Sequence, residues 1–215
     1  MLDKTAFDKS NIYASDKQDI IAYELLGEGK YFVDVGAGNG MHGSNTIVLE
    51  KQYGWKGICI EAHPYHTPTL KAGRNCICLQ SVVSDKEGLS NFCYEAVNTP
   101  TVALHNLNHS WAGGSGLVSC HHLSPEKISH WYTQLASTVT LDSILKTHNA
   151  PKHIDFLDID VEGAEFKVLK GINWEDTSFG LINIEIINDR VLQFLEQKGY
   201  VSWQKAGQDT MFKPC

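Results

Sequence analysis

The stretch Tyr31-Phe-Val-Asp-Val-Gly-Ala-Gly-Asn-Gly40 decides the fold, because an apolar segment runs directly into three alternating glycines. Its first half, residues 31–35, is typical of a strand that is buried on both faces of a parallel sheet. Gly36, Gly38 and Gly40 permit positive φ angles and let the backbone approach a bulky ligand closely. The pattern predicts a nucleotide-type ligand at the carboxyl end of a strand in an open α/β sheet.

A second strand that ends in an acid follows this loop. The segment Lys56-Gly-Ile-Cys-Ile-Glu-Ala-His-Pro64 contains a predicted strand over residues 57–61, with Glu61 at its end. An acid roughly 20 residues past the glycines is the expected partner of the two ribose hydroxyls of an adenosine cofactor. In the alternative interpretation, Glu61 only ends a strand at the protein surface.

Two adenosine cofactors are compatible with these landmarks. Gly38-Asn-Gly-Met-His-Gly43 matches the G-x-G-x-x-G pattern of dinucleotide dehydrogenases, which would make the ligand NAD. An Asp at a strand end before Gly-x-Gly-x-Gly is instead how many enzymes hold S-adenosylmethionine, whose amino group Asp34 would receive. Residues 44–46 supply N-cap types for a helix that ends at Tyr53, and its free N–H groups can meet a carboxylate.

The third strand, predicted at residues 76–80, leads into Ser81-Val-Val-Ser84. The small and apolar side chains of Ser81 and Val82 are expected at the faces of the adenine ring, unless they only end the strand. The predicted cofactor contacts are Asp34, Gly36, Ala37, Gly38, Gly40, Ser44, Asn45, Thr46, Glu61, Ala62, Ser81 and Val82.

Apolar periodicity divides the chain into alternating strands and helices. Strands or extended segments are expected at residues 31–35, 57–61, 76–80, 89–94, 153–158, 180–186, 200–204 and 210–213. Helices are expected at residues 17–26, 44–53, 64–72, 140–148, 164–170 and 188–198. This alternation predicts one α/β domain over residues 1–215, with a mostly parallel sheet, right-handed crossovers and a C-terminal antiparallel hairpin.

Residues 155–171 read Asp-Phe-Leu-Asp-Ile-Asp-Val-Glu-Gly-Ala-Glu-Phe-Lys-Val-Leu-Lys-Gly and contain a D-x-E-G-x-E core followed by a leucine and a glycine. This segment resembles the hallmark of the FkbM-type methyltransferases. Further segments agree with that family in order, namely Gln18-Asp19, Ser44-Asn-Thr46, Gly54-Trp-x-Gly57, Thr140-Leu-Asp-Ser-Ile144 and Ile182-Asn-Ile-Glu-Ile186. The match covers most of the chain, with a gap at about residues 96–137.

The resemblance implies a Rossmann-like class I methyltransferase fold that uses S-adenosylmethionine. Many members of this family methylate hydroxyl groups on sugars and other natural products, so a small-molecule or glycan acceptor is expected. FkbM-type domains also occur attached to glycosyltransferases, and the chain is compatible with one module of a larger glycan-synthesis enzyme. A terminal hairpin is shared by class I methyltransferases and is not expected of a dinucleotide dehydrogenase.

Three acids lie at or just beyond the end of the strand predicted at residues 153–158. Alternation puts Asp158 and Asp160 on one side of the strand end, with Glu162 just beyond. Such crowding raises a pKa or attracts a divalent cation with oxygen ligands, Mg²⁺ or Mn²⁺, for which Asp158 and Asp160 are the candidate ligands. Asp160 is the first candidate for the general base and Asp158 the second, and Glu162 is a candidate substrate contact. Alternatively, Glu162 and Glu165 only stabilise the first turn of the next helix.

Glu185 is a second candidate for contact with the substrate. In the strand predicted at residues 180–186, Asn183 and Glu185 fall on one face and isoleucines on the other. Both faces of a central parallel strand are normally apolar, so two polar residues there require partners. Glu185 could bind a substrate hydroxyl, whereas at a sheet edge the same pattern would be simple amphipathic alternation.

The segment at about residues 96–137 is an irregular excursion and a predicted acceptor-binding lid. It contains His105, His109, Cys120, His121, His122 and His130, together with Trp111 and Trp131. Cys120, His121 and His122 are adjacent, which is awkward geometry for three ligands of one tetrahedral zinc ion, so a zinc site is not expected. Aromatic rings that stack on sugar faces, and imidazoles that meet hydroxyls, suit a carbohydrate. A histidine of this segment is a further candidate for the general base.

Composition excludes several classes of function. The formal net charge is -7 and the chain has no Lys/Arg-rich run, which argues against nucleic acid as a partner. No stretch is long and apolar enough to span a membrane, and Met1-Leu-Asp-Lys-Thr5 lacks a signal-peptide pattern, so a cytoplasmic location is expected. The sequence therefore predicts an S-adenosylmethionine-dependent O-methyltransferase. An NAD-dependent oxidoreductase and a non-catalytic nucleotide-binding module are the alternatives.

Overall fold

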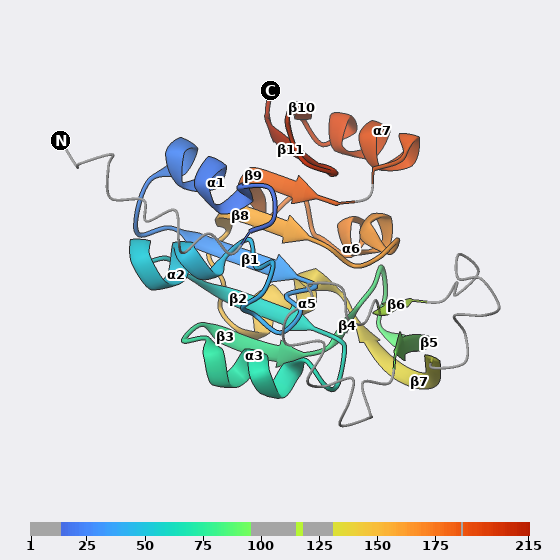
Figure 1. Cartoon of the computed structure of the whole chain (residues 1–215). Helices are drawn as coiled ribbons and strands as arrows, with labels where there is room; N and C mark the ends of the chain where they lie inside the picture. The colour runs from blue at the N-terminus through green and yellow to red at the C-terminus, as the bar shows by residue number, and fades with distance from the viewer. Residues whose placement is uncertain (1–13, 96–114, 118–130, 186) are drawn as a thin grey trace.

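The computed structural model describes residues 14–95, 115–117, 131–185 and 187–215 (Figure 1). Within these ranges the chain forms a seven-stranded sheet and a smaller four-stranded sheet. The strands of the large sheet are β1 (Tyr31–Val35), β2 (Lys56–Glu61), β3 (Ile77–Gln80), β8 (His153–Ile159), β9 (Ser178–Ile184), β10 (Tyr200–Ala206) and β11 (Asp209–Pro214). Their order across the sheet is β10-β11-β9-β8-β1-β2-β3.

The predicted topology of the large sheet is confirmed. β3, β2, β1, β8 and β9 pair in parallel, whereas β11 is antiparallel to both β9 and β10. The last strand of the chain, β11, therefore lies between β9 and β10, and β9 is a central strand (Figure 1). Met211 and Phe212 of β11 are buried, which explains why this strand takes the inner position.

Helices cover both faces of the large sheet. They are α1 (Gln18–Leu26), α2 (Ile47–Tyr53), α3 (Thr67–Gly73), α5 (Leu141–Thr147), α6 (Glu165–Lys170) and α7 (Asp189–Gln197). The helix that was expected from residue 44 begins at Ile47, with Thr46 at its N-cap. The hydroxyl of Ser44 accepts hydrogen bonds from the N–H groups of Thr46 and Ile47 at 3.4 and 3.2 Å. Within the described ranges, no helix is long and apolar enough to cross a membrane.

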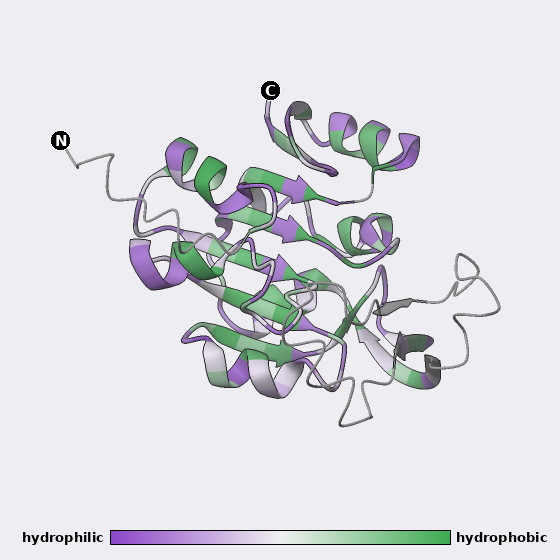
Figure 2. Ribbon diagram, viewed as in Figure 1, coloured by the Kyte–Doolittle hydropathy of each residue, from purple (hydrophilic) through white to green (hydrophobic). Residues whose placement is uncertain are grey.

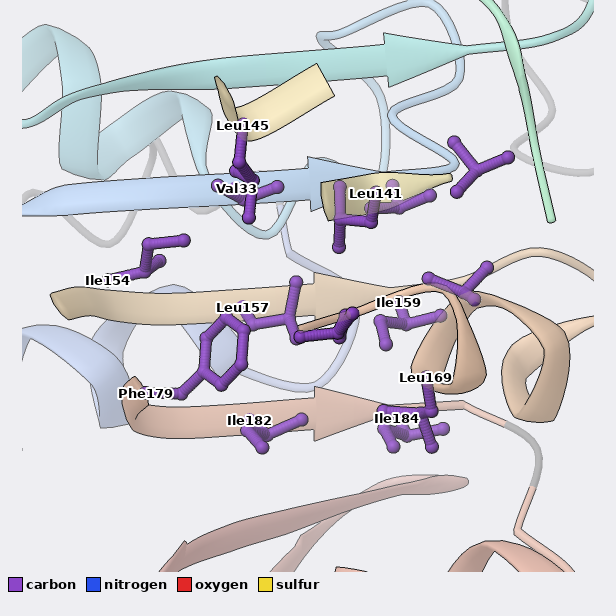
Figure 3. Packing of buried hydrophobic residues seen from close by; sticks show 14 of the residues in the cluster. Val33, Leu141, Leu145, Ile154, Leu157, Ile159, Leu169, Phe179, Ile182 and Ile184 are labelled. Carbon is purple, nitrogen blue, oxygen red and sulfur yellow. The ribbon is translucent and has the colours of Figure 1, made fainter. Parts of the chain in front are cut away.

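β1 is buried on both faces, as its sequence predicts. Val33 belongs to the hydrophobic cluster that includes α5, α6 and α7, and Phe32 belongs to the cluster that includes α1, α2 and α3. Val33, Leu157 and Ile182 occupy paired positions on β1, β8 and β9, and α5 contributes Leu145 to the same layer (Figure 3). Each such fully buried side chain contributes about 1.5–3 kcal/mol to stability.

The small sheet contradicts one expectation from the sequence. Its strands are β4 (Val82–Val83), β5 (Gly88–Glu95), β6 (Ser115–Leu117) and β7 (Trp131–Val139), in the order β4-β7-β5-β6. The prediction of irregular structure is wrong for residues 131–137, because β7 pairs antiparallel with the whole of β5. Residues 96–114 and 118–130, with the histidines and Cys120 of the predicted lid, lie outside the described residues. The small sheet lies beyond the carboxyl ends of the large-sheet strands (Figure 1).

The first turn of α1 contains a buried acid that lacks one hydrogen bond. Asp19 is 0% exposed, and its Oδ1 accepts a hydrogen bond from the N–H of Ile20 at 2.8 Å. Its Oδ2 has no hydrogen-bond partner among the described residues. Burial raises the pKa of Asp19 from 3.8 to about 6.

This acid should make the protein less stable as the pH rises from about 4 to about 6. The unfolded chain ionises Asp19 near pH 4, but the folded protein resists ionisation up to about pH 6, so stability present below pH 4 is lost across this window. Asp19→Asn should remove a loss on the order of 2–3 kcal/mol, measured by urea unfolding at pH 4 and pH 7. Glu175→Gln, at an exposed position, is the control. Equal pH dependence in Asp19→Asn and wild type would contradict this prediction.

Candidate functional site

The loop after β1 has two glycines that the packing requires and one that faces open space. Gly36 and Gly40 have φ angles of +96° and +76°. A Cβ atom at Gly36 would overlap the carbonyl oxygen of Asp160, and one at Gly40 would overlap Leu70 of α3. A Cβ atom at Gly38, by contrast, would have nothing within 4 Å. The loop therefore rests on β8 and α3 and leaves Gly38 open to a ligand.

Glu61 lies beneath this loop. Its side chain is 5% exposed, and its carboxylate accepts hydrogen bonds from the N–H groups of Gly38 at 2.7 Å and His63 at 2.5 Å. Burial raises the pKa of Glu61 to about 7, against the opposing effect of these two hydrogen bonds. The interpretation of Glu61 as a surface acid is wrong, because it is buried beside the central glycine of the loop. Ala62 follows it and is half-buried.

The polar side chains around the loop form hydrogen bonds with other groups of the protein. Asp34 is 2% exposed, and its Oδ2 accepts a hydrogen bond from the hydroxyl of Thr46 at 2.5 Å. Asn45 donates to both carboxylate oxygens of Asp158, at 3.2 and 3.0 Å. The hydroxyl of Ser44 accepts hydrogen bonds from the N–H groups of Thr46 and Ile47 at the start of α2. These side chains therefore brace the loop, and direct contact between them and a cofactor stays a prediction.

A row of polar residues crosses the carboxyl ends of three adjacent strands. Asp34 of β1 is paired in register with Asp158 of β8, which is paired with Asn183 of β9. Figure 2 shows the hydrophilic colour at these strand ends against hydrophobic strand centres. Asn183 is 1% exposed and donates to Asp158 at 2.8 Å and to Asp209 at 2.6 Å, and Asp209 also accepts from Gln18 at 2.8 Å. The side-chain N–H groups of Asn183 therefore have the partners that a polar residue of a central strand requires, whereas its Oδ1 is buried with no hydrogen-bond partner among the described residues.

The sequence led us to expect Asp158 and Asp160 at one site, but Asp158 is not among the acids whose oxygen atoms converge with those of Asp160. It is 3% exposed and bonded to Asn45 and Asn183. Burial, with the charges of Asp34 and Asp209 added, raises the pKa of Asp158 well above its ordinary value. Asp158 therefore lies within the sheet, where its carboxylate is buried and already bonded to two amides, and it is poorly placed to meet a substrate or a metal ion.

The acids that the structure brings together are Asp160, Glu162 and Glu185, whose carboxylate oxygens lie within 4.8 Å of one another. The backbone of Asp160 is bonded to Val35 O at 2.9 Å, directly before the glycine loop. Glu162 has a φ angle of +54°, which is uncommon for a residue other than glycine, and the turn brings its side chain back toward the other two acids. The cluster therefore borders the loop, at the carboxyl edge of the sheet.

The electrostatics of this cluster favour a proton shared between two of its carboxylates. Burial, and then the hydrogen bond and charge of Glu185, raise the pKa of Asp160 to about 10. Burial and the charges of Glu185 and Glu165 raise the pKa of Glu162. Glu185 Oε2 is buried without a hydrogen-bond donor in the described part of the chain. The cluster can therefore accept a hydrogen bond from a hydroxyl group, or bind a cation through oxygen ligands.

Glu165 behaves differently from these three acids. It lies in the first turn of α6, is 2% exposed, and accepts a hydrogen bond from the N–H of Gly163 at 2.9 Å. This is the structural role expected for it. Ser81 donates its N–H to Glu61 O at 3.1 Å, and it also lines a cleft of about 330 Å³ beside β3. Val82, the other residue predicted beside adenine, is 7% exposed and belongs to β4.

Two residues near the loop escaped the interpretation of the sequence. Arg74, at the end of α3, is 6% exposed and bonded to the loop from below. His63 is 0% exposed, stacks on His66 at 4.2 Å between ring centroids, and meets the edge of Tyr94 of β5 at 5.3 Å. The position of His63, two residues after Glu61, could have indicated from the sequence that it lies near the site. An arginine in an ordinary helix–strand connection carries no comparable signal.

A family model matches most of the chain. The model of the methyltransferase FkbM domain matches residues 34–202. No protein with a curated description matches the sequence.

Several solved methyltransferase structures are similar at low identity. The methyltransferase FkbM from Methylobacillus flagellatus is 12% identical, with a TM-score of 0.48 over 86% of this chain and 43% of that chain. A TehB-like SAM-dependent methyltransferase from Corynebacterium glutamicum is 11% identical, with a TM-score of 0.47 over 93% and 88%. Precorrin-6y C5,15-methyltransferase from Geobacter metallireducens is 13% identical, with a TM-score of 0.44 over 95% and 89%. The chain thus spans less than half of the Methylobacillus protein.

Removing the Glu185 carboxylate should lower the pKa of Asp160, because the hydrogen bond and charge of Glu185 both favour protonated Asp160. We expect carbon NMR of labelled aspartate to show Asp160 protonated at pH 8 in wild type, and its titration to move to lower pH in Glu185→Gln. Glu165→Gln, whose side-chain oxygen can still accept from Gly163, should leave the titration of Asp160 in place. Titration of Asp160 near pH 4 in wild type would show that the two acids do not share a proton.

Proposed function

The chain belongs to the FkbM methyltransferase family, and from this premise we propose that it transfers a methyl group from S-adenosylmethionine to a hydroxyl group of a sugar, glycan or glycosylated metabolite. The observation that carries the proposal is the contact between the glycine loop and the acid cluster. Gly36 packs against the backbone of Asp160, so a cofactor on the loop and a hydroxyl at the cluster would be neighbours.

The residues around the loop fit S-adenosylmethionine. The open space at Gly38 accommodates a ligand, and the buried carboxylate of Glu61 has two N–H donors and room in its hydrogen-bonding capacity for two ribose hydroxyls. We assign the ribose to Glu61, the methionine part to the loop backbone, and adenine to the region of Ala62, Ser81 and Val82. When bound, the cofactor supplies an activated methyl group on a sulfonium centre.

The protein's own contribution would be alignment and removal of a proton. Alignment of two reactants can supply roughly 7–11 kcal/mol of the barrier. The acceptor hydroxyl would donate its proton to the pair Asp160 and Glu185 while its oxygen bonds to the methyl carbon and the carbon–sulfur bond breaks, which releases S-adenosylhomocysteine. A general base typically adds about 10²–10⁴-fold. Because burial, with the hydrogen bond and charge of Glu185, raises the pKa of Asp160 to about 10, the base would be the pair that shares one proton rather than Asp160 alone.

A divalent cation is the alternative device for the same step. Asp160, Glu162 and Glu185 offer the hard oxygen ligands that Mg²⁺ or Mn²⁺ prefers, and such an ion would polarise the hydroxyl in place of the shared proton. Asp158 would not be a ligand, because its oxygens are bonded to Asn45 and Asn183. Activity that survives a chelator would favour the proton-sharing pair.

The wider setting belongs to the same proposal. Membership of a methyltransferase family favours methyl transfer over the hydride transfer of an NAD-dependent enzyme. We propose one methyltransferase domain that acts in the cytoplasm, with the segment at about residues 96–137 contributing to the acceptor pocket, and with a glycan-synthesis enzyme as its larger context. A non-catalytic nucleotide-binding module would bind the cofactor without turnover.

Asp160→Asn should lower kcat for methyl transfer by about 10²–10⁴-fold and leave the Kd for S-adenosylmethionine unchanged, because the cluster handles the proton and the loop holds the cofactor. The measurement is transfer of labelled methyl from S-adenosylmethionine to a panel of glycans and glycosylated metabolites, each paired with the deoxy analogue that lacks the acceptor hydroxyl. Glu175→Gln is the control. Unchanged transfer by Asp160→Asn would remove Asp160 from the mechanism, and transfer to no hydroxyl acceptor would favour the non-catalytic module.

Binding of S-adenosylmethionine should weaken as the pH falls below about 7. Two ribose hydroxyls that donate to Glu61 stabilise its ionised form, so a protein in which Glu61 is protonated must lose that proton on binding. We expect calorimetry in buffers of different ionisation enthalpy to show proton release at pH 6. Glu61→Gln should abolish this release and raise the Kd by about 10- to 100-fold. A Kd that is independent of pH in wild type would place the ribose elsewhere.

A further inference from the structure

Arg74 makes a concentrated set of contacts beneath the glycine loop. It follows α3 directly, and its side chain is 0% exposed. The guanidinium donates to the carboxylate of Glu50, to the carbonyl of Gly40 at 3.3 Å, to the hydroxyl of Ser44 at 3.2 Å and to the hydroxyl of Thr46 at 2.9 Å. Three of these four partners lie in the segment that joins β1 to α2.

The direction of these hydrogen bonds orients the loop. A guanidinium can only donate, so the hydroxyl oxygen of Thr46 must accept from Arg74 and its own hydrogen is directed to Asp34 Oδ2 at 2.5 Å. The hydroxyl of Ser44 accepts from Arg74 and also from the N–H groups at the start of α2. One planar cation therefore sets the positions of a carbonyl and two hydroxyls within seven residues of chain.

The charge of Arg74 is balanced by buried acids. Burial opposes ionisation of Glu50, but the hydrogen bond and charge of Arg74 hold the pKa of Glu50 below its ordinary value. Burial raises the pKa of Asp34, and the charge of Arg74 acts against this rise. The guanidinium also lies over the ring of Phe32, 5.5 Å from its centroid. These contacts hold the side chain in one place below the loop.

We propose that Arg74 is a positioning residue of the cofactor site, which fixes the loop over residues 36–46 in the shape that receives S-adenosylmethionine without touching it. This inference rests on the proposed function. Gly40 shows how close the support is, because a Cβ atom there would meet both Leu70 and the Cγ atom of Arg74. Lysine cannot replace this arginine, since a single ammonium cannot reproduce the fork that reaches Gly40, Ser44 and Thr46 together.

The expected effect falls on cofactor affinity and spares the chemical step. Arg74→Lys and Arg74→Ala should raise the Kd for S-adenosylmethionine by about 10- to 100-fold, since small displacements of a binding loop have effects of this size. At saturating cofactor, kcat should stay close to that of wild type, because the acid cluster is not altered. Free guanidinium at low millimolar concentration should restore affinity in Arg74→Ala by occupying the vacated position.

The experiment is calorimetric titration of wild type and both variants with S-adenosylmethionine, with and without guanidinium, together with thermal unfolding. Leu145→Ala is the matched control, because it removes buried side-chain volume beneath the opposite face of the sheet. Two results would overturn the inference but leave the proposed function standing. One is a cofactor affinity in both Arg74 variants equal to that of Leu145→Ala. The other is guanidinium that restores affinity in Leu145→Ala as well as in Arg74→Ala. Failure of wild type to bind S-adenosylmethionine would overturn the proposed function, and the inference with it.

Discussion

Acids buried at the carboxyl edge of a parallel sheet must find hydrogen-bond donors, and this requirement organises the molecule. Asp34 and Asp158 occupy paired positions on β1 and β8, where bulk water cannot reach them. Asp34 is served by the hydroxyl of Thr46, and Asp158 by the amides of Asn45 and Asn183. Through these bonds the sheet grips the start of α2, so the loop between β1 and α2 is held at both its ends.

The supported loop and the acid cluster divide the work of the proposed reaction. Arg74 and α3 support the loop from below, Glu61 lies beneath Gly38, and Asp160 packs against Gly36. The three acids of the cluster are held by backbone bonds to the ends of β1 and β8 and by an unusual turn at Glu162. Methyl transfer from S-adenosylmethionine, which is intrinsically reactive, requires a rigid loop that holds the cofactor and a group that accepts the proton of the acceptor.

Local patterns predicted the parts of the fold that depend on neighbouring residues. The strand and glycine loop, Glu61 and the terminal hairpin each follow from a continuous segment. Partners distant in sequence could not be predicted: Asp158 accepts hydrogen bonds from Asn45, which lies 113 residues earlier. The pairing of β7 with β5 was missed for the same reason, since the sequence between them shows no hairpin signal. The role of Arg74 could not be predicted either, because it depends on the packing of α3 under the glycine loop.

The central claim is that the loop and Glu61 hold S-adenosylmethionine, and calorimetric titration of the purified chain tests it most directly. S-adenosylmethionine, S-adenosylhomocysteine and NAD would each be titrated with and without Mg²⁺ or Mn²⁺. The account predicts binding of the first two ligands and no binding of NAD. Binding of NAD alone would contradict it, because the same glycines and the same acid would then serve a dinucleotide.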